Sequence, residues 1–449
     1  MNTILSNLTL LYKSPLKKQL ALSYLLKGAG IGISLMYVPL MLTYLSPAQF
    51  GLWVAITSVI NWLRLFDVGI GNGLRFHLAS SLAVSNMDKA KELVSTTYAI
   101  IGSIFVAVWL LFLVVNPLIN WQSLLNSDLI SSSEYMKIMM IAITAIVFTF
   151  ILDLVKILYA AHGDTATGNF LQLLSSTLSL IGIYLLSVFT LKGQLDLAVA
   201  VVALSPLVVY IIATLYTFKK KYAAIRPSLN FVKFKNSKDL FNLSAKFFVV
   251  QITATIIFAS LPFIITRFYG PESVAQYHVA NSIFNLPIMV IGLFTAPLTP
   301  FVTREYAKEN LSWVRGSLKK ALLLSAIVSL GTVLLVILSP YIYKLWLGDK
   351  IDIPFKLSVF IGIYTIINIM VNPLSSFMNA IGKIDILLWL APVGVGMFIG
   401  GCFLFDMWIG NVIAVVLALS LTSIVGLIVE PFVLKKHLKI NFGFKMSNK

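Results

Sequence analysis

The residues with the clearest chemical meaning lie at the end of an apolar run, where Arg64 and Asp67 precede three alternating glycines, Gly69, Gly71 and Gly73. A dinucleotide-binding loop also has spaced glycines, but it needs a strand before it and a soluble helix after it. Here the preceding stretch of about twenty residues is apolar and long enough to cross a bilayer. The segment therefore predicts a pair of intramembrane charges beside a hinge formed by the three glycines.

A second cation, Lys27, lies in the first apolar run, at a depth similar to that of Arg64 on the next helix. At about 1.5 Å per residue, Lys27 is roughly 10 Å and Arg64 roughly 9 Å from the same membrane face. A charge at the centre of a membrane helix costs roughly 2.5–3.5 kcal/mol, so such residues usually have a function. Two cations at one depth would suit an anionic group. The alternative is that Arg64 and Asp67, three apart on one helix face, only neutralise each other.

Further polar residues in the apolar runs are candidates for contact with a polar cargo. They are Arg267, which lies near the outer interface and could instead be a membrane anchor, and Asn61, Asn281 and Asn285. The last two are one helical turn apart and could bind sugar hydroxyls, whereas such residues more often tie helices together. Tyr37 and Trp53 could stack on sugars, with packing or interfacial anchoring as the alternative. Asp153 and Lys156 are expected to form a local ion pair.

Composition sets the fold class. Of 449 residues, 59% are hydrophobic and 11% are charged, which is typical of an all-α polytopic membrane protein. The sequence predicts about twelve transmembrane helices, with prolines 117, 340 and 354 in the connections. The expected spans are 19–43, 50–72, 91–115, 135–159, 168–189, 196–218, 241–267, 274–302, 317–338, 355–378, 384–405 and 410–434.

The basic residues predict the orientation and the division of the chain. The net charge of +17 could suggest binding to nucleic acid. The excess Lys and Arg fall in alternate connections, however, which indicates the positive-inside rule instead. Both termini are then cytoplasmic. The basic segment 219–239 separates two six-helix bundles, 1–218 and 240–449, that echo each other weakly at a shift of 224 residues. Parallel repeats of this kind are typical of transporters with a central cavity.

Three segments carry a resemblance to a known family. They run over Leu45–Trp53, Phe66–Arg75 and Tyr269–Tyr277, and the second holds the Asp-x-Gly-x-Gly-Asn-Gly-x-Arg pattern. In these segments and in its span count, the sequence resembles the MOP superfamily, and within it the Wzx-type polysaccharide (O-antigen) flippases. The resemblance implies a MATE-like pair of pseudo-symmetric bundles around a central cavity, in the bacterial inner membrane. It also implies an undecaprenyl-diphosphate-linked oligosaccharide as cargo in lipopolysaccharide biosynthesis, with membrane lipids and the polysaccharide polymerase machinery as partners.

Two other functions stay open on the sequence. A MATE-type multidrug exporter shares the architecture, but its organic-cation cargo would favour an acidic cavity, whereas the first helix has Lys27 and no acid. A membrane polymerase or glycosyltransferase would need a large outer loop with catalytic groups, and the outer connections here are short. We therefore expect a transporter without catalytic residues, metal or cofactor. Coupling to a proton or sodium gradient stays open.

Overall fold

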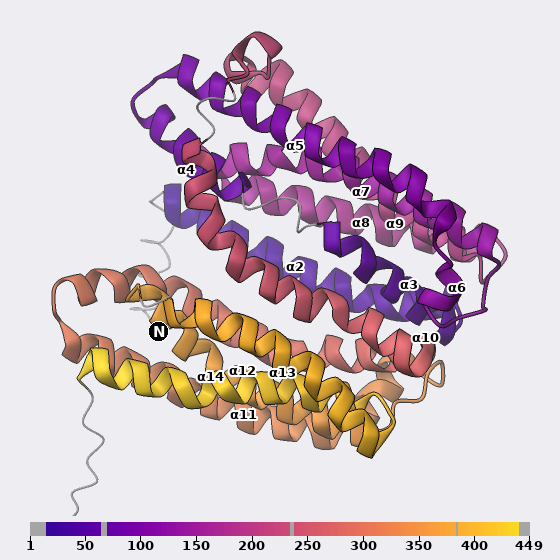
Figure 1. Ribbon diagram of the computed structural model, residues 1–449. Coiled ribbons are helices and arrows are strands. Elements are labelled where there is room, and N and C mark those ends of the chain that lie inside the picture. The colour runs from indigo at the N-terminus through magenta and orange to yellow at the C-terminus, as the bar shows by residue number, and fades with distance from the viewer. Residues whose placement is uncertain (1–14, 64–69, 234–237, 383–384, 440–449) are drawn as a thin grey trace, which may run out of the picture. The chain divides into compact units, whose positions relative to one another are not determined.

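The structure is a computed structural model that describes the backbone of residues 15–63, 70–233, 238–382 and 385–439 (Figure 1). The side chains of residues 15–20, 72, 238–255 and 385–391 fall outside this description. In the described ranges the longer elements are all α-helices, short 3-10 or π turns follow α5 and α9, and no strand is present. Arg64, Asp67 and Gly69 lie outside the described residues.

The chain divides into two compact units, each described here by itself. The first comprises Met1–Thr255 with Gly270–Glu272, and the second comprises Ile256–Tyr269 with Ser273–Lys449. The helices before residue 220 are α2 (Pro15–Tyr44), α3 (Pro47–Asn61), α4 (Ile70–Ala83), α5 (Met87–Val115), α6 (Trp121–Leu124), α7 (Ser132–Ala161), α8 (Thr165–Phe189) and α9 (Leu195–Tyr216). The later helices are α10 (Lys238–Ala307), α11 (Leu311–Leu347), α12 (Phe355–Ala380), α13 (Asp385–Ile409) and α14 (Ile413–Leu438).

Ten helices in the described part of the chain are long and apolar enough to cross a membrane. One of them, Ile256–Ala307, has 52 residues and is interrupted at Gly270, whose φ of 80° and ψ of 170° are not helical. Glycine tolerates this left-handed φ, and the break falls between the predicted spans 241–267 and 274–302. The prediction of an all-α, multi-span membrane protein is therefore confirmed.

The second predicted span, 50–72, was wrong as a single helix. Helix α3 ends at Asn61 and a separate helix, α4, begins at Ile70. Gly71 and Gly73 therefore lie in the first turn of α4 and not at the end of the preceding helix, and both are buried. Apolar residues continue past Asn61 in the sequence, so hydropathy alone gave no signal for the end of α3.

Proline 340 was also misplaced by the sequence pattern, because it lies inside α11 and not in a connection. A proline in a helix leaves the carbonyl four residues earlier without its N–H partner. In α11 that carbonyl belongs to Val336, and the Oγ of Ser339 donates to it at 2.8 Å. The serine hydroxyl thus replaces the missing backbone donor, and the helix continues to Leu347.

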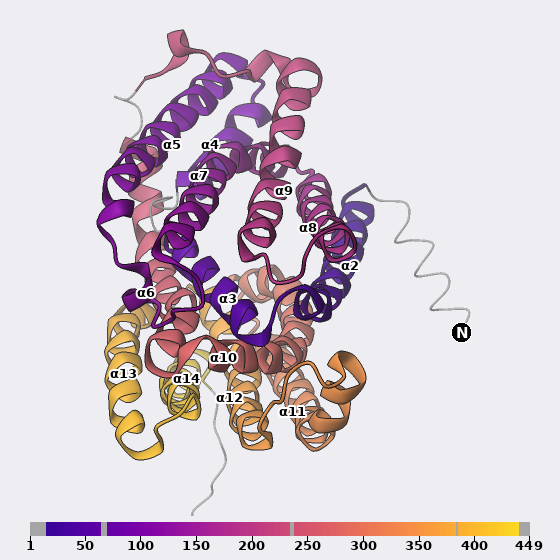
Figure 2. The same cartoon turned by 90° about the vertical axis from the view of Figure 1, so that its right-hand side faces the viewer.

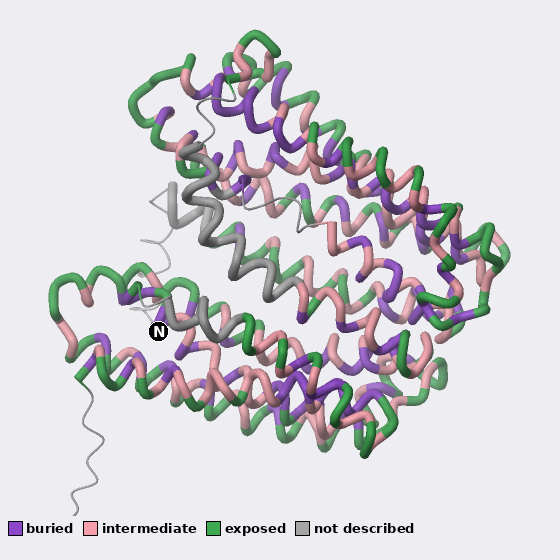
Figure 3. The backbone as a smooth tube through the Cα atoms, in the orientation of Figure 1, coloured by how far each residue is buried: buried purple, intermediate pink, exposed green. Residues whose placement is uncertain are grey.

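A lipid-facing surface is most evident on α11. Its exposed large apolar residues recur every three or four positions, and each is more than two-fifths exposed: Leu323, Ile327, Leu330, Leu334, Ile337, Tyr341 and Leu345. This spacing puts them on one helix face. Exposed and half-buried residues also follow much of α5 in Figure 3. An exposed apolar stripe of this length is what hydrocarbon contact requires.

Within the first unit, α2 and α8 lie side by side and run in the same direction (Figure 2). Ser23 Oγ and Thr165 Oγ1 are 3.3 Å apart near their beginnings, and Tyr44 Oη and Thr190 Oγ1 are 3.1 Å apart at their ends. Helix α9 packs closely on α8 at Gly182, where an added Cβ would collide with Val201 Cγ1. These contacts hold α2, α8 and α9 together as the helices that line the cavity described below.

Candidate functional site

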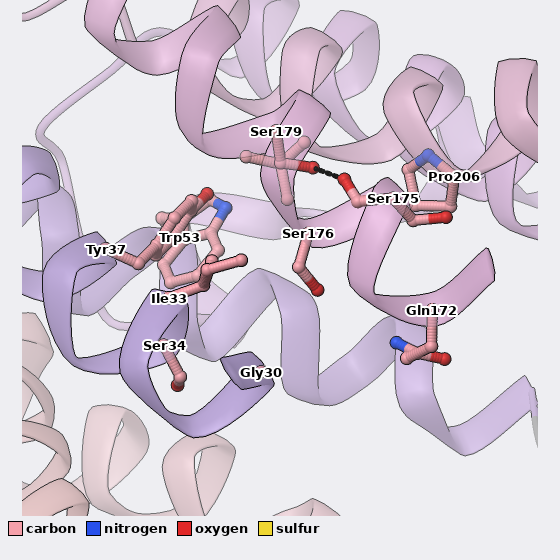
Figure 4. Close-up of a pocket in the computed structure, with 11 residues that line it drawn as sticks. Gly30, Ile33, Ser34, Tyr37, Trp53, Gln172, Ser175, Ser176, Ser179 and Pro206 are labelled. Carbon is pink, nitrogen blue, oxygen red and sulfur yellow. Dashed lines mark hydrogen bonds between the residues drawn. The ribbon is translucent and has the colours of Figure 1, made fainter. Parts of the chain in front are cut away.

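A cavity of about 260 Å³ lies inside the first unit, among α2, α3, α8 and α9 (Figure 4). Its lining residues are Gly30, Ile33, Ser34, Tyr37, Trp53, Gln172, Ser175, Ser176, Ser179, Val202 and Pro206. Ligand pockets for small molecules usually measure roughly 300–1,000 Å³, so this cavity suits one ring-sized group. Its polar lining consists of hydroxyls, one amide and two aromatic rings, without a charged residue.

The aromatic side of the cavity is held in place by its neighbours. The rings of Tyr37 and Trp53 have centroids 5.7 Å apart at an interplanar angle of 44°. Trp53 also stacks on Phe50, at 5.7 Å and 26°, and Phe50 is fully buried. The hydroxyl of Tyr37 is buried and has no hydrogen-bond partner among the described residues. A buried hydroxyl usually has a partner, so this one is a candidate for bonding a ligand.

The opposite side is formed by α8, which presents Gln172, Ser175, Ser176 and Ser179 at helical spacing (Figure 4). Two of these serines donate to their own helix: Ser175 Oγ to Leu171 O at 2.9 Å, and Ser179 Oγ to Ser175 O at 3.0 Å. Ser176 makes no hydrogen bond in the described part of the chain, so its hydroxyl is available to a ligand. A cavity with aromatic rings on one side and hydroxyls on the other suits a ligand ring that has an apolar face and polar substituents.

Two lysines lie next to the cavity. Lys27 is exposed and precedes the lining residues Gly30 and Ser34 by three and seven positions, which places it on the same face of α2. Lys156 of α7 reaches the other rim, where its Nζ is 3.5 Å from Oε1 of Gln172. Lys156 also pairs with Asp153 at 2.6 Å, which confirms the predicted local ion pair.

Helix α8 is fixed at its start by Asp164, which caps it. Asp164 accepts from the N–H of Thr167 at 3.1 Å, from the Thr167 hydroxyl at 2.8 Å and from Lys221 Nζ at 2.9 Å. Burial alone would raise the pKa of this carboxyl, but the hydrogen bonds from Lys221 and Thr167 outweigh it and hold the pKa below its ordinary value. Asp164 is therefore charged at neutral pH and orients the serine side of the cavity.

The sequence profile of a family described as polysaccharide biosynthesis protein matches residues 16–304, more than half of the chain. The chain belongs to this family. A second profile, MatE, matches residues 247–404. A protein of Salmonella typhi named as an O-antigen transporter is 22% identical over 430 residues, which cover 91% of this chain and 94% of that protein.

Solved structures show the fold that this polysaccharide biosynthesis protein shares. An inward-facing multidrug resistance MATE family transporter of the MOP superfamily has a TM-score of 0.76 at 16% identity, over 91% of this chain and 95% of that one. Lipid II flippase MurJ, in an inward closed conformation, has a TM-score of 0.69 at 16% identity, over 93% and 89%. The fold expected from the MOP resemblance is therefore confirmed.

The sequence-predicted site residues of this polysaccharide biosynthesis protein divide between its two units. Lys27 lies beside the cavity, and Asn61 is the half-buried last residue of α3. In the second unit, Arg267 is exposed just before Gly270, and Asn281 and Asn285 are half-buried one turn apart on α10. Arg64 and Asp67 lie outside the described residues.

Sequence reasoning missed the serine side of the cavity. Gln172, Ser175, Ser176 and Ser179 follow the i, i+3, i+4, i+7 pattern of a single helix face, and this signal was present in the sequence. It went unused because serines in an apolar helix usually bond to their own backbone, as Ser175 and Ser179 do.

Proposed function

We propose that this protein is a flippase that moves an undecaprenyl-diphosphate-linked oligosaccharide from the cytoplasmic to the outer leaflet of the bacterial inner membrane, by alternating access. The observation that carries the proposal is the family match over residues 16–304. Support comes from the relative named as an O-antigen transporter, which aligns along nearly the whole chain. The fold is that of transporters, and no step of the proposed activity requires a catalytic residue.

The cavity of the first unit suits one part of such a cargo. Its rings and free hydroxyls fit a single sugar ring, with Tyr37 and Trp53 against the apolar face and Ser176 on a hydroxyl. Lys27, on the same face of α2, is placed to meet the neighbouring diphosphate. In this proposal Arg64 supplies a second cation, Asp67 orients it, and Asn61, Arg267, Asn281 and Asn285 contact the glycan.

A MATE-type drug exporter is the second candidate, favoured by the MatE match over residues 247–404 and by the shared fold. An organic cation would be repelled by Lys27 beside the cavity, and no acidic residue lines that cavity. The charge of the site thus favours an anionic cargo over a cationic one.

The decisive experiment is deletion of the gene in its native host. We expect loss of surface polysaccharide and accumulation of lipid-linked repeat units in the cytoplasmic leaflet, because synthesis continues while transfer stops. Restoration by the cloned gene is the control. Normal surface polysaccharide in the deletion strain, together with new sensitivity to cationic drugs, would replace the flippase proposal with the exporter.

The proposal includes an orientation with both termini in the cytoplasm and the basic segment 219–239 as the connection between 1–218 and 240–449. A reporter active only outside the cytoplasm should work when fused after Ser127, because the stretch 116–133 has no Lys or Arg. The same reporter fused after Lys235 should be silent. Activity in the reverse pattern would invert the orientation and the direction of transport.

In this proposal the polysaccharide polymerase machinery receives the lipid-linked oligosaccharide after its transfer. The change between the inward-open and outward-open states is assigned to the glycine segment. Gly71 and Gly73 are buried in the first turn of α4, where small residues let helices approach closely. With Gly69 they form the proposed hinge. Complete export by a stably inserted variant with all three changed to Ala would remove the hinge from the mechanism.

A further inference from the structure

Helix α14 carries a carboxylate inside the membrane-spanning part of the second unit. Glu430 is 2% exposed and lies eight residues before the helix end at Leu438, about 12 Å along the axis. Its Oε1 accepts a hydrogen bond from Ser375 Oγ at 2.7 Å. Its Oε2 is buried and has no partner among the described residues. One oxygen of this carboxyl is therefore held, and the other is available.

No cation neutralises Glu430 in the described part of the chain. Helices α11, α12 and α13 pack against α14, and Val302 of α10 joins Leu434 of α14 in one apolar cluster. The titratable or charged residues on the half of these helices nearest Glu430 are Arg304, Glu305 and Tyr306 of α10 with Lys308 just after it, Arg315, Lys319 and Lys320 of α11, Asp385 of α13, and Lys435, Lys436 and His437 of α14. The corresponding half of α12 has none.

The nearest of these groups are exposed or bonded to partners other than Glu430. Lys319, Lys320, Lys435 and Lys436 are exposed, Arg315 Nε donates to Leu438 O at 2.8 Å, and Arg304 and Lys308 pair with Glu305. The side chain of Asp385 lies outside the described ones. An isolated carboxylate in a membrane interior is strongly disfavoured, so it takes a proton or a cation. Glu430 is thus a group that must bind something positive.

The space around the carboxyl favours a proton. A Cβ on Gly426 would lie 3.6 Å from Glu430 Oε1 and 3.3 Å from Val371 Cγ1, so α12 and α14 are closely packed there. A hard metal cation needs several oxygen ligands, and the described polar neighbour of Glu430 is the single hydroxyl of Ser375. A proton on Oε2 needs no such shell.

A polar stripe on α12 connects this carboxyl to the helix end. Asn368, Asn372, Ser375 and Asn379 follow at spacings of four, three and four, which places them on one face. Asn372 Oδ1 accepts from Thr295 Oγ1 of α10 at 3.0 Å, and Asn379 is exposed. Amides and hydroxyls hydrogen-bond water, and a chain of such water molecules would give a proton a route to the surface.

We propose that Glu430 is a proton-binding site, and that one proton is taken up and released there in each transport cycle. The second half of this statement rests on the proposed transport function, whereas proton binding itself does not. Protonation leaves the carboxyl neutral and compatible with the packed state, and loss of the proton favours a state in which Glu430 meets water. Transport would then be driven by a proton gradient through the second unit.

The first test needs no cargo. Difference infrared spectra of the purified full-length protein are recorded during a pH titration, and the C=O band of a protonated carboxyl is followed. We expect a titrating band in the wild type that is absent in Glu430→Gln and unchanged in Glu272→Gln, an exposed glutamate of α10. Ser375→Ala removes the hydrogen bond that stabilises the ionised form, so the band should titrate about one pH unit higher.

Two results would overturn the proposal. One is a band unaffected by both Glu430→Gln and Ser375→Ala; the other is a band that sodium abolishes at constant pH, which would make Glu430 a sodium site. In cells, Glu430→Gln should lower surface polysaccharide at least tenfold at equal protein level, while Glu272→Gln should not. A Glu430→Gln variant that exports normally would refute the coupling role. An unaltered deletion strain would instead refute the flippase proposal and leave the titration result standing.

Discussion

Replacement of Lys27 by Met should lower surface polysaccharide at least tenfold, while Lys27→Arg should retain much of it. A hydrogen bond to a charged group contributes roughly 1.5–3 kcal/mol, which corresponds to a factor of about 10 to 150 in affinity. Met has a similar length and removes only the charge. Lys27 forms no ion pair within the described residues, so its loss leaves no carboxylate without a partner in that part of the chain.

The measurement is surface polysaccharide in a deletion strain that makes each variant at the same protein level. Lys192→Met is the matched control, because Lys192 is exposed in the connection between α8 and α9, outside the cavity. Full export by Lys27→Met would refute the cationic site. Arg64→Lys should be intermediate, since a bidentate contact becomes a point charge. Rescue of Arg64→Ala by Asp67→Asn would instead identify a structural ion pair.

The second large effect is expected at the cavity. Trp53→Ala removes the ring that packs against both Tyr37 and Phe50, so export should fall roughly tenfold, whereas Trp53→Phe should keep part of it. Because a smaller side chain also loosens packing, a filling variant separates the two causes. Ser176→Leu places a larger side chain in the empty space and should block export without lowering the melting temperature in detergent.

Ser187→Leu is the control for that filling variant, since Ser187 is on the same helix but does not line the cavity. Normal export by both Trp53→Ala and Ser176→Leu would show that the cavity takes no part in cargo recognition. If Ser187→Leu also abolished export, the loss would come from a disturbed helix α8 and not from filling of the cavity.

The apolar runs predicted most of the helices because hydrocarbon thickness alone sets their length. The expected span 355–378 corresponds to α12, Phe355–Ala380, and the gap after residue 267 corresponds to the break at Gly270. The Asp153–Lys156 pair was also predictable, since residues three apart meet on any helix. These features depend on neighbours in sequence.

The features that the sequence did not reveal depend on distant partners. The cavity joins Tyr37 to Ser176, and the two come together only because α2 pairs with α8. Glu430 accepts a hydrogen bond from Ser375, which lies 55 positions earlier on another helix. The sequence of α14 alone therefore could not predict that this carboxyl is buried. Pro340 is an exception, since its partner is local. The Ser339 hydroxyl that replaces the missing backbone N–H has no sequence pattern by which it could be recognised in advance.

The pairing of α2 with α8 also has a consequence for how the chain is made. Ser23 and Thr165 are 142 residues apart, and at about 5–20 residues per second their synthesis is separated by roughly 7 to 30 seconds. During that interval the first helix must remain in the bilayer with Lys27 unaccompanied by the helix that later lies beside it. Membrane insertion of the early spans therefore precedes formation of the cavity, and a variant that slows emergence of the fifth span should leave the first one open to quality-control proteases.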